Sequence, residues 1–167
     1  MYSPAIARPR LTSTPHHGAP RSLGLRTQMM ARGPGWRLAE GEGGIWTIKI
    51  TKEARDAVLT WAHILRTLHD IGQSHGLRPL VLDLRDAQRV CGPVVEAAGL
   101  VFELFESHGL RLAALVGHDV VQAARMHRLM THHATTSGRC FMDEDDCDEW
   151  TRPWVARHRV GLSGLRV

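Results

Sequence analysis

The chain has 167 residues, of which 43 % are hydrophobic and 23 % are charged, a composition that excludes collagenous and wholly disordered proteins. Its formal net charge of +4 is unevenly spread, because six of the 21 basic residues and none of the 17 acidic residues precede residue 40. The remaining chain is slightly acidic, so we do not expect its folded part to bind nucleic acid.

Residues 1–35 form the first segment of the chain. They mix Pro, Gly, Ser, Thr and Arg without a sustained period, and such a segment cannot bury enough apolar surface to offset the entropy of ordering. We therefore predict a disordered tail, with an organelle transit segment and a translation start at Met29 or Met30 as alternatives. An Arg-rich tail could also bind DNA, and salt would weaken that interaction steeply.

A hairpin and a helix are predicted next. Residues 36–38 and 45–50 carry strand patterns, and the glycines of residues 40–44 are typical of the turn between two such strands. Thr51 is predicted to cap a helix that runs to about Ser74, because the apolar residues that follow recur in steps of three and four.

Three later strands and three later helices alternate along the rest of the chain. Two of the strands are short apolar runs, the pattern of central strands covered on both faces. The predicted strands are residues 80–84, 112–116 and 139–142. The predicted helices are residues 93–107, with Pro93 at the first position, residues 120–133, and a terminal helix that begins in the acidic residues 143–149.

Strand and helix alternation of this kind predicts an α/β domain, which we place over residues 36–152. Right-handed crossovers make the later strands parallel, and the first hairpin adds an antiparallel edge. The expected fold is a small mixed β-sheet flanked by helices. Residues 153–167 are expected to be a frayed C-terminal extension.

Four phrases of the sequence resemble a known family. They are Leu80-Val-Leu-Asp-Leu-Arg-Asp-Ala87, Gly109-Leu-Arg-Leu-Ala-Ala-Leu-Val-Gly117, Ala123-Ala-Arg-Met-His127 and Gly138-Arg-Cys-Phe-Met-Asp-Glu-Asp145. Their order and spacing resemble the STAS-like proteins, relatives of the sulfate-transporter and anti-sigma-factor-antagonist domain. The resemblance implies a STAS-like fold that works through a protein partner or a small ligand and not as an enzyme.

The resemblance also implies where partners bind. Family members that act as anti-sigma-factor antagonists carry a phosphorylatable Ser or Thr where the helix after the Leu-Asp-Leu strand begins. This chain has Cys91-Gly92-Pro93 there and no hydroxyl residue between Ser74 and Ser107. We therefore expect a regulatory or scaffolding module without that phosphorylation switch. Its interaction surface is expected at Arg89, Cys91, Gly92, Pro93 and Glu96.

A ligand-binding protein is the alternative from a different class. Asp83, Asp86 and Asp119 follow predicted parallel strands, and ligands of open α/β sheets bind at the carboxyl ends of strands. Aspartate also favours such loops because it caps backbone groups. A small apolar or anionic ligand would be held by Asp83, Arg85, Asp86, His118, Asp119 and Arg125.

Signals for cofactor chemistry are weak in this sequence. The histidines of residues 127–133 lack the spacing of three or four that brings ligands onto one helix face, and Cys140 and Cys147 are too far apart for a structural zinc motif. Cys91 precedes a helix N-terminus, where a thiol is either reactive or simply buried. We therefore predict no cofactor and no metal, and keep a thiol or metal-dependent enzyme as a third hypothesis.

The cysteines and the apolar runs bear on location. Three irregularly spaced cysteines form no disulfide framework, which favours a reducing compartment and a cytoplasmic protein. The most apolar stretch, residues 94–104, is interrupted by Glu96 and Glu103 and is too short to span a membrane. The expected partner is another protein, and a homodimer is left open.

Overall fold

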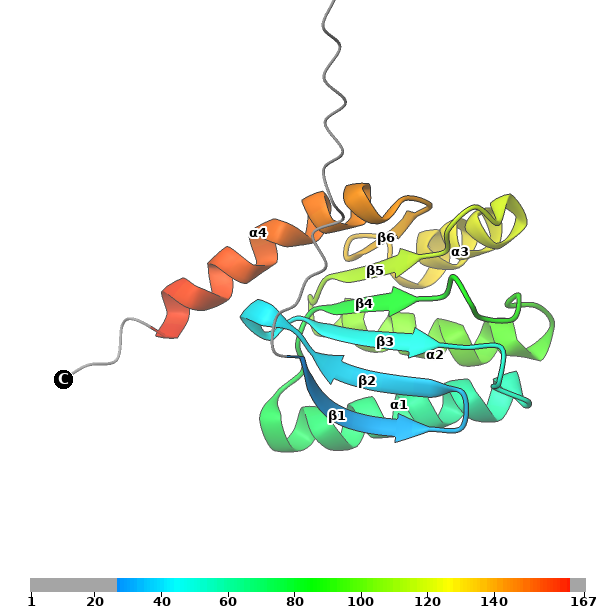
Figure 1. Ribbon diagram of the computed structural model, residues 1–167, viewed down its shortest axis with the longest axis horizontal. Coiled ribbons are helices and arrows are strands. Elements are labelled where there is room, and N and C mark those ends of the chain that lie inside the picture. Colours follow the sequence, from blue (N-terminus) through cyan, green and yellow to red (C-terminus); the bar gives the residue numbers. More distant parts are fainter. Residues whose placement is uncertain (1–26, 163–167) are drawn as a thin grey trace, which may run out of the picture.

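Residues 27–162 are described by the computed structural model, and they form one six-stranded sheet with four α-helices. The spatial order of the strands follows the sequence, so each strand lies beside the next one in the chain (Figure 1). The strands are β1 (Gln28–Gly33), β2 (Trp36–Glu40), β3 (Trp46–Ile50), β4 (Leu80–Asp83), β5 (Leu112–Leu115) and β6 (Gly138–Phe141). The fold class expected from the sequence, a mixed sheet flanked by helices, is confirmed.

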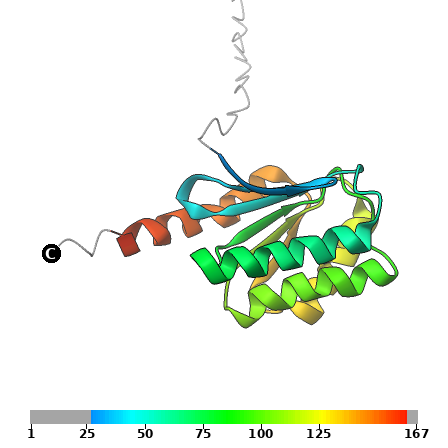
Figure 2. The ribbon, with the colours of Figure 1, turned by 90° about the horizontal axis from the view of Figure 1, so that it is seen from below.

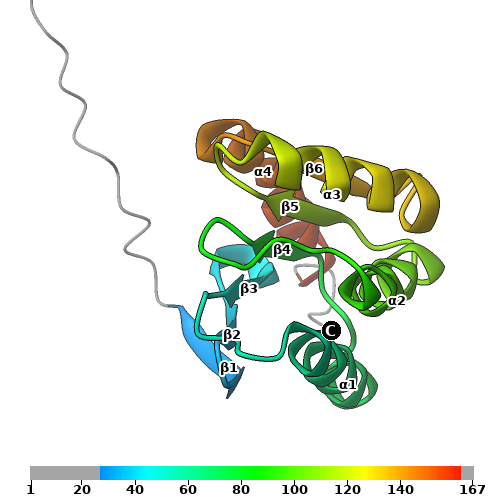
Figure 3. The same cartoon turned by 90° about the vertical axis from the view of Figure 1, so that its right-hand side faces the viewer.

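One strand of the sheet, β2, runs opposite to the other five. β1, β2 and β3 are antiparallel neighbours, whereas β3, β4, β5 and β6 are parallel to one another. Helices α1 (Ala57–His75), α2 (Pro93–Ser107) and α3 (Val120–His133) join the parallel strands and cover one face of the sheet. Helix α4 (Glu144–Leu162) lies on the opposite face, beside β5 and β6 (Figure 3).

Both faces of the central strands are buried, which explains their unbroken apolar sequences. In β5, Leu112 and Ala114 pack in the main core with α1, α2 and α3. The intervening Ala113 and Leu115 pack in a second cluster against Cys147 and Trp154 of α4. Side chains of a strand alternate between its two faces, so one apolar run supplies both clusters.

The prediction of a disordered tail up to residue 35 is wrong for residues 28–33. These residues form β1, which pairs antiparallel with β2 and contributes Met30 and Ala31 to the edge of the core. The turn that follows requires Gly35, whose φ is 72° and whose added Cβ would lie 2.2 Å from the backbone nitrogen of Ala54. β1 lacks regular apolar alternation and is stabilised by β2, so the domain begins before residue 36. Residues 1–26 lie outside the described residues.

Helix α1 begins later than its predicted cap at Thr51. The observed cap is Asp56, whose carboxylate accepts a hydrogen bond from the backbone nitrogen of Leu59 at 3.0 Å. Thr51 instead donates its backbone N–H to the carbonyl oxygen of Gly35 at 2.8 Å. Two residues of the same capping class compete here, and the long-range contact with Gly35 decides the boundary.

Helix α4 begins as predicted and extends further than predicted. The carboxylate of Asp143 accepts a hydrogen bond from the backbone nitrogen of Asp145 at 2.8 Å and so caps the acidic first turn. The helix continues through Pro153 to Leu162, where the sequence led us to expect fraying. Trp150 and Trp154 stack edge-on at 4.9 Å between ring centroids, which packs the turn around the proline. Residues 163–167 lie outside the described residues.

The remaining predicted elements are confirmed to within about a residue, namely β4, α2, β5, α3 and β6. None of the helices formed by residues 27–162 is both long and apolar enough to cross a lipid bilayer.

Candidate functional site

The carboxyl ends of the parallel strands meet at one edge of the sheet, as Figure 1 shows for the arrowheads of β3, β4 and β5. We call this edge, with the loops of residues 84–92, 116–119 and 142–143, the carboxyl edge. It carries five of the six residues that the sequence proposed as ligands and three of the five that it proposed as an interaction surface. The others lie on the adjoining helices, Pro93 and Glu96 in the first turn of α2 and Arg125 on α3. Two groups of ion pairs organise this edge.

The first group is centred on Asp83, which ends β4 and is 6 % exposed. Arg85 binds this carboxylate through two hydrogen bonds of 2.9 Å, from Nε to Oδ1 and from Nη2 to Oδ2. A third bond of 2.5 Å joins Nη1 of Arg85 to Oε2 of Glu144 at the start of α4. Gly117 gives the guanidinium stem its space, because an added Cβ would lie 3.2 Å from Cγ of Arg85. Arg85 therefore connects the end of β4 to the start of α4.

A lysine completes this group. Nζ of Lys49 lies 2.8 Å from Oδ2 of Asp86 and 3.9 Å from Oδ2 of Asp83. Burial opposes ionisation of Asp83, but the hydrogen bonds from Arg85 and the charges of Arg85 and Lys49 together hold its pKa below the ordinary value. The hydrogen bond to Asp83, reinforced by Glu144, raises the pKa of Arg85. Asp83 and Asp86 are thus engaged with cations of the chain itself.

The second group links the loop of residues 84–92 to α3. Nε of Arg89 donates to Oδ2 of Asp119 at 2.7 Å, while Oδ1 of Asp119 accepts hydrogen bonds of 3.1 Å from the backbone nitrogens of Val121 and Gln122. The bond from Arg89, followed by these backbone bonds, lowers the pKa of Asp119. Asp119 therefore caps α3 and pairs with Arg89.

Gln122 is a residue of this edge that the sequence reasoning missed. It is 2 % exposed, and its Oε1 accepts a hydrogen bond of 3.0 Å from the backbone nitrogen of Val90. Nη1 of Arg125 donates to the carbonyl oxygen of Val90 at 3.4 Å. The available signal was the position of Gln122 on the apolar stripe of α3, four residues before the buried Met126.

The predicted interaction residues form the exposed rim of this edge. Cys91, Gly92 and Pro93 are exposed where α2 begins, and Glu96 lies in its first turn. Gly92 has a φ of 56°, a conformation that favours glycine. His118 is exposed in the neighbouring loop. Two apolar side chains of α3 add to the rim, Val120 at 68 % and Val121 at 44 % exposure.

The other two cysteines, Cys140 and Cys147, are less exposed than Cys91. Burial raises the pKa of the Cys140 thiol to about 11, and burial together with nearby carboxylates raises that of Cys147 to about 12. All three cysteines are free thiols. Among the described residues, no group of three or more His, Cys, Asp or Glu side chains is arranged to hold a metal ion.

A polar cluster at the opposite edge of the sheet was also missed by the sequence reasoning. Glu106 of α2 accepts hydrogen bonds from the backbone nitrogens of Thr136 at 3.2 Å and Ser137 at 3.0 Å. The hydroxyls of Thr135, Thr136 and Ser137 donate to the same carboxylate. The hydroxyl bonds from Ser137 and Thr136 lead the causes that lower the pKa of Glu106 to about 2. This carboxylate fastens the loop between α3 and β6 to α2.

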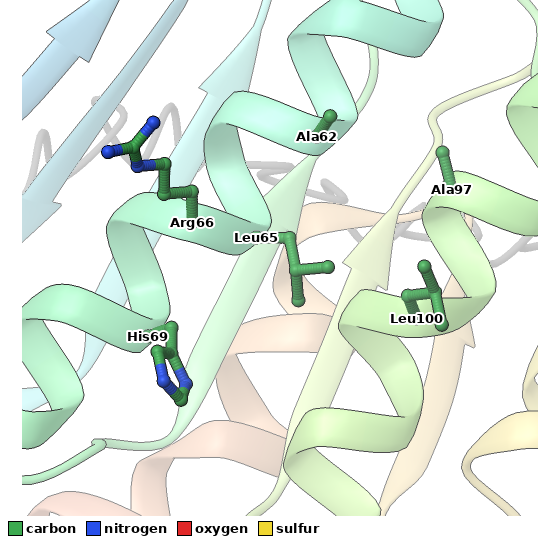
Figure 4. Close-up of a pocket in the computed structure, with 6 residues that line it drawn as sticks. All are labelled: Ala62, Leu65, Arg66, His69, Ala97 and Leu100. Carbon is green, nitrogen blue, oxygen red and sulfur yellow. The ribbon is translucent and has the colours of Figure 1, made fainter.

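Two surface grooves lie away from the carboxyl edge. One, of about 370 Å³, runs between α1 and α2 and is lined by Ala62, Leu65, Arg66, His69, Ala97 and Leu100 (Figure 4). The other, of about 360 Å³, lies between α3 and β6 and is lined by His127, Met130, Thr131, Ala134, Thr135, Gly138, Arg139 and Cys140. Neither groove is lined by a residue that the sequence proposed as a ligand.

Comparisons with known proteins give one match. No family model and no curated protein matches the chain. A solved structure of a substituted form of RsbS from Moorella thermoacetica, a STAS-domain protein, is similar with a TM-score of 0.46 and 16 % sequence identity. The match covers 76 % of this chain and 98 % of that one.

Proposed function

We propose that this protein is a non-enzymatic regulatory or scaffolding module that binds a protein partner through the rim of its carboxyl edge. This rim consists of Arg89, Cys91, Gly92 and Pro93, Glu96, and the exposed valines Val120 and Val121. The observation that carries the proposal is that the charged groups of the edge pair with one another next to an exposed rim. Such an arrangement holds a surface in a fixed shape.

The internal pairing favours a binding surface over a catalytic or ligand site. The carboxylates of Asp83, Asp86 and Asp119 already accept from Arg85, Lys49 and Arg89 at 2.7–2.9 Å. A metal or anionic ligand would have to replace these partners. A protein partner can bind the exposed rim without disturbing the pairs that Arg85 and Lys49 form. The hydrogen bonds from Val90 to Gln122 and from Arg89 to Asp119 attach the rim loop to α3.

The rim also has a surface chemistry suited to a protein. Val120 and Val121 are exposed at the start of α3, Cys91 and Pro93 are exposed at the start of α2, and Arg89 and Glu96 bring opposite charges. Apolar contacts with a polar periphery are typical of protein interfaces. The resemblance of the sequence to STAS-like proteins supports the same location, because it places regulatory contacts at the start of this helix. A cytoplasmic location is part of this proposal.

The free thiol of Cys91 allows a direct test. Cys91 is exposed, whereas Cys140 is half-buried and Cys147 is buried, so a photoreactive maleimide should label Cys91 first. The labelled full chain is irradiated in an extract of its source cells. The matched control is the Cys91→Ser, Ser107→Cys double variant, which carries the probe at the other end of α2.

We expect one protein to be cross-linked from position 91 and not from position 107. Its affinity for the purified chain should fall about tenfold or more in the Arg89→Ala and Glu96→Ala variants, since interface charges and their neighbours contribute at this scale. Unchanged affinity in both variants would count against the surface. A retained small molecule whose loss follows substitution of Asp83 or His118 would support the ligand-binding alternative instead.

A further inference from the structure

Helices cover both faces of the sheet and leave its last strand, β6, at an edge. Figure 2 shows the layers, with α1 and α2 on one side of the sheet and α4 on the other. β6 pairs with β5, and no strand formed by residues 27–162 lies on its other side. An edge strand of this kind presents backbone groups to which a further strand can bind.

Every second residue of β6 turns its backbone towards β5. The carbonyl oxygen of Ser137, just before β6, accepts a hydrogen bond of 2.9 Å from the backbone nitrogen of Leu112. The carbonyl oxygen of Phe141 accepts one of 2.9 Å from Val116. Because the backbone groups of successive residues point to opposite sides of a strand, the N–H and C=O of Cys140 point away from β5. Neither group has a hydrogen-bond partner among the described residues.

One face of this edge borders the groove of about 360 Å³ between α3 and β6. Cys140 faces α3, since its Sγ lies 3.9 Å from the carbonyl oxygen of Ala123, and it lines the groove. On the side of α3, Met130 and Ala134 provide apolar lining and His127 a polar border. In a strand added beside β6, the side chain opposite Cys140 would enter this groove.

The other face of the edge carries an arginine without an ion-pair partner. Arg139 is exposed, and its Cζ lies 5.6 Å from the ring centroid of Phe141, which packs in the cluster under α4. None of the salt bridges within residues 27–162 includes Arg139. No carboxylate lines the groove beside it. A cross-strand acidic side chain would therefore find a free guanidinium here.

We propose that β6 binds an extended segment of another protein, which adds a further strand to the sheet. The segment carries an apolar residue that enters the groove and, next to it, an acidic residue that pairs with Arg139. Adjacent residues of a strand point to opposite faces, so two neighbouring side chains meet both features. Backbone hydrogen bonds to Cys140 hold the segment, and the two side chains select its sequence.

Charge separates this occupant from segments of the chain itself. Residues 1–26 and 163–167 contain no Asp or Glu, so neither can supply the acidic residue. A second copy that pairs its β6 antiparallel about Cys140 would make the two Arg139 side chains diagonal neighbours on one face, which like charges disfavour. A different protein with an acidic extended segment therefore fits the edge best.

This surface is separate from the rim of the carboxyl edge, because it consists of β6 and the second half of α3. Arg139→Glu therefore tests the β6 edge alone, and Arg89→Ala tests the rim alone. Either proposal can fail while the other holds. If both hold, the chain can bind two proteins at once.

The first experiment selects ligands for the full chain from a phage-displayed library of random linear peptides. We expect enriched peptides that share an acidic residue beside an apolar one. Arg139→Glu should weaken their binding about tenfold, because it replaces an attraction with a repulsion. Replacing the acidic residue of the peptide with lysine should restore binding to this variant.

The matched control is Arg128→Glu, which makes the same charge change at an exposed residue of α3 that does not line the groove. It should bind the peptides as the native chain does, and so should Arg89→Ala. Three outcomes would overturn the proposal: no enriched peptide, equal loss of binding in Arg128→Glu and Arg139→Glu, or binding that depends on Arg89 and not on Arg139. Circular dichroism checks that each variant remains folded.

The second experiment tests the backbone pairing with a selected peptide. Its backbone nitrogens are methylated one at a time, which should abolish binding at alternate positions and spare the positions between them, because only alternate N–H groups face β6. Hydrogen exchange at the backbone N–H of Cys140 should slow when the peptide binds, while exchange in α1 stays unchanged. Equal effects of methylation at successive positions, or an unchanged exchange rate at Cys140, would overturn the added strand.

Discussion

Replacing Glu106 with glutamine should destabilise the domain in a way that depends on pH. Glu106 accepts bonds from two backbone nitrogens and three hydroxyls of the loop between α3 and β6. The amide of glutamine retains one acceptor oxygen and places an NH₂ donor where Ser137 also donates. The variant therefore loses hydrogen bonds to a charged acceptor, which are stronger than those to a neutral one.

The magnitude follows from the pKa of this carboxylate. The hydroxyls of Ser137 and Thr136 lead the effects that lower its pKa from 4.5 to about 2. One pKa unit corresponds to about 1.4 kcal/mol, so the full difference would be about 3 kcal/mol. Solvent screening of this partly exposed group reduces the expected loss to about 1–2 kcal/mol.

The sign of the pH dependence is fixed by the direction of this shift. The folded carboxylate has the lower pKa, so the unfolded chain binds the proton more readily. The stabilisation is complete above the unfolded value of 4.5 and is lost as the pH falls towards about 2. The difference in stability between the native chain and Glu106→Gln should therefore be constant near neutral pH and shrink below pH 4.5.

Urea unfolding at a series of pH values measures this difference, followed by fluorescence of buried tryptophans such as Trp46, which is 1 % exposed. Glu96→Gln is the matched control on the same helix, and its stability should stay close to that of the native chain. Equal stability of Glu106→Gln and the native chain at neutral pH would refute the argument. A difference that does not change with pH would refute the electrostatic part of it.

Three further changes probe the carboxyl edge and the β1 turn. Asp83→Asn should lower the free energy of unfolding, measured with urea, by about 2 kcal/mol, because Arg85 loses a buried carboxylate partner but keeps Glu144 and partial exposure to water. An unchanged free energy of unfolding would show that the pair is dispensable. Gln122→Leu should lower the free energy of unfolding by about 1–3 kcal/mol, because the backbone N–H of Val90 loses its acceptor. Hydrogen exchange at this N–H should become faster, and unchanged slow exchange there would contradict the contact. Gly35→Ala should lower the melting temperature by at least about 4 °C, because φ at this position is 72° and the added Cβ would lie 2.2 Å from the backbone nitrogen of Ala54; an unchanged melting temperature would exclude strain at this turn.

Local sequence patterns were sufficient to predict the elements whose own apolar residues reflect how they are buried. β5, and β4 up to its last residue Asp83, are apolar because both faces of these strands are covered, and Pro93 marks the start of α2. The alternation of these strands and helices determines the mixed α/β class, since parallel strands need crossover helices. Asp83 and Asp119 could be placed at the carboxyl edge for the same reason.

Elements that depend on distant partners could not be read from the sequence. β1 has no clear alternation, and its strand conformation comes from pairing with β2 and from the Gly35 turn against Ala54. The start of α1 was misplaced because the N–H of Thr51 is bound to Gly35, sixteen residues away. Local propensity cannot anticipate such long-range hydrogen bonds.

The candidate site likewise has some features that the sequence predicts and others that only the tertiary structure sets. The sequence by itself predicted that aspartates, arginines and a cysteine lie near the ends of the parallel strands, and the structure showed that this cysteine, Cys91, is exposed. Only the tertiary structure decided that Arg85 spans Asp83 and Glu144, and that Arg89 pairs with Asp119. The partners of each pair can be as many as 59 residues apart in the chain. Their pairing depends on strand register and loop packing, which set distances that sequence spacing does not contain.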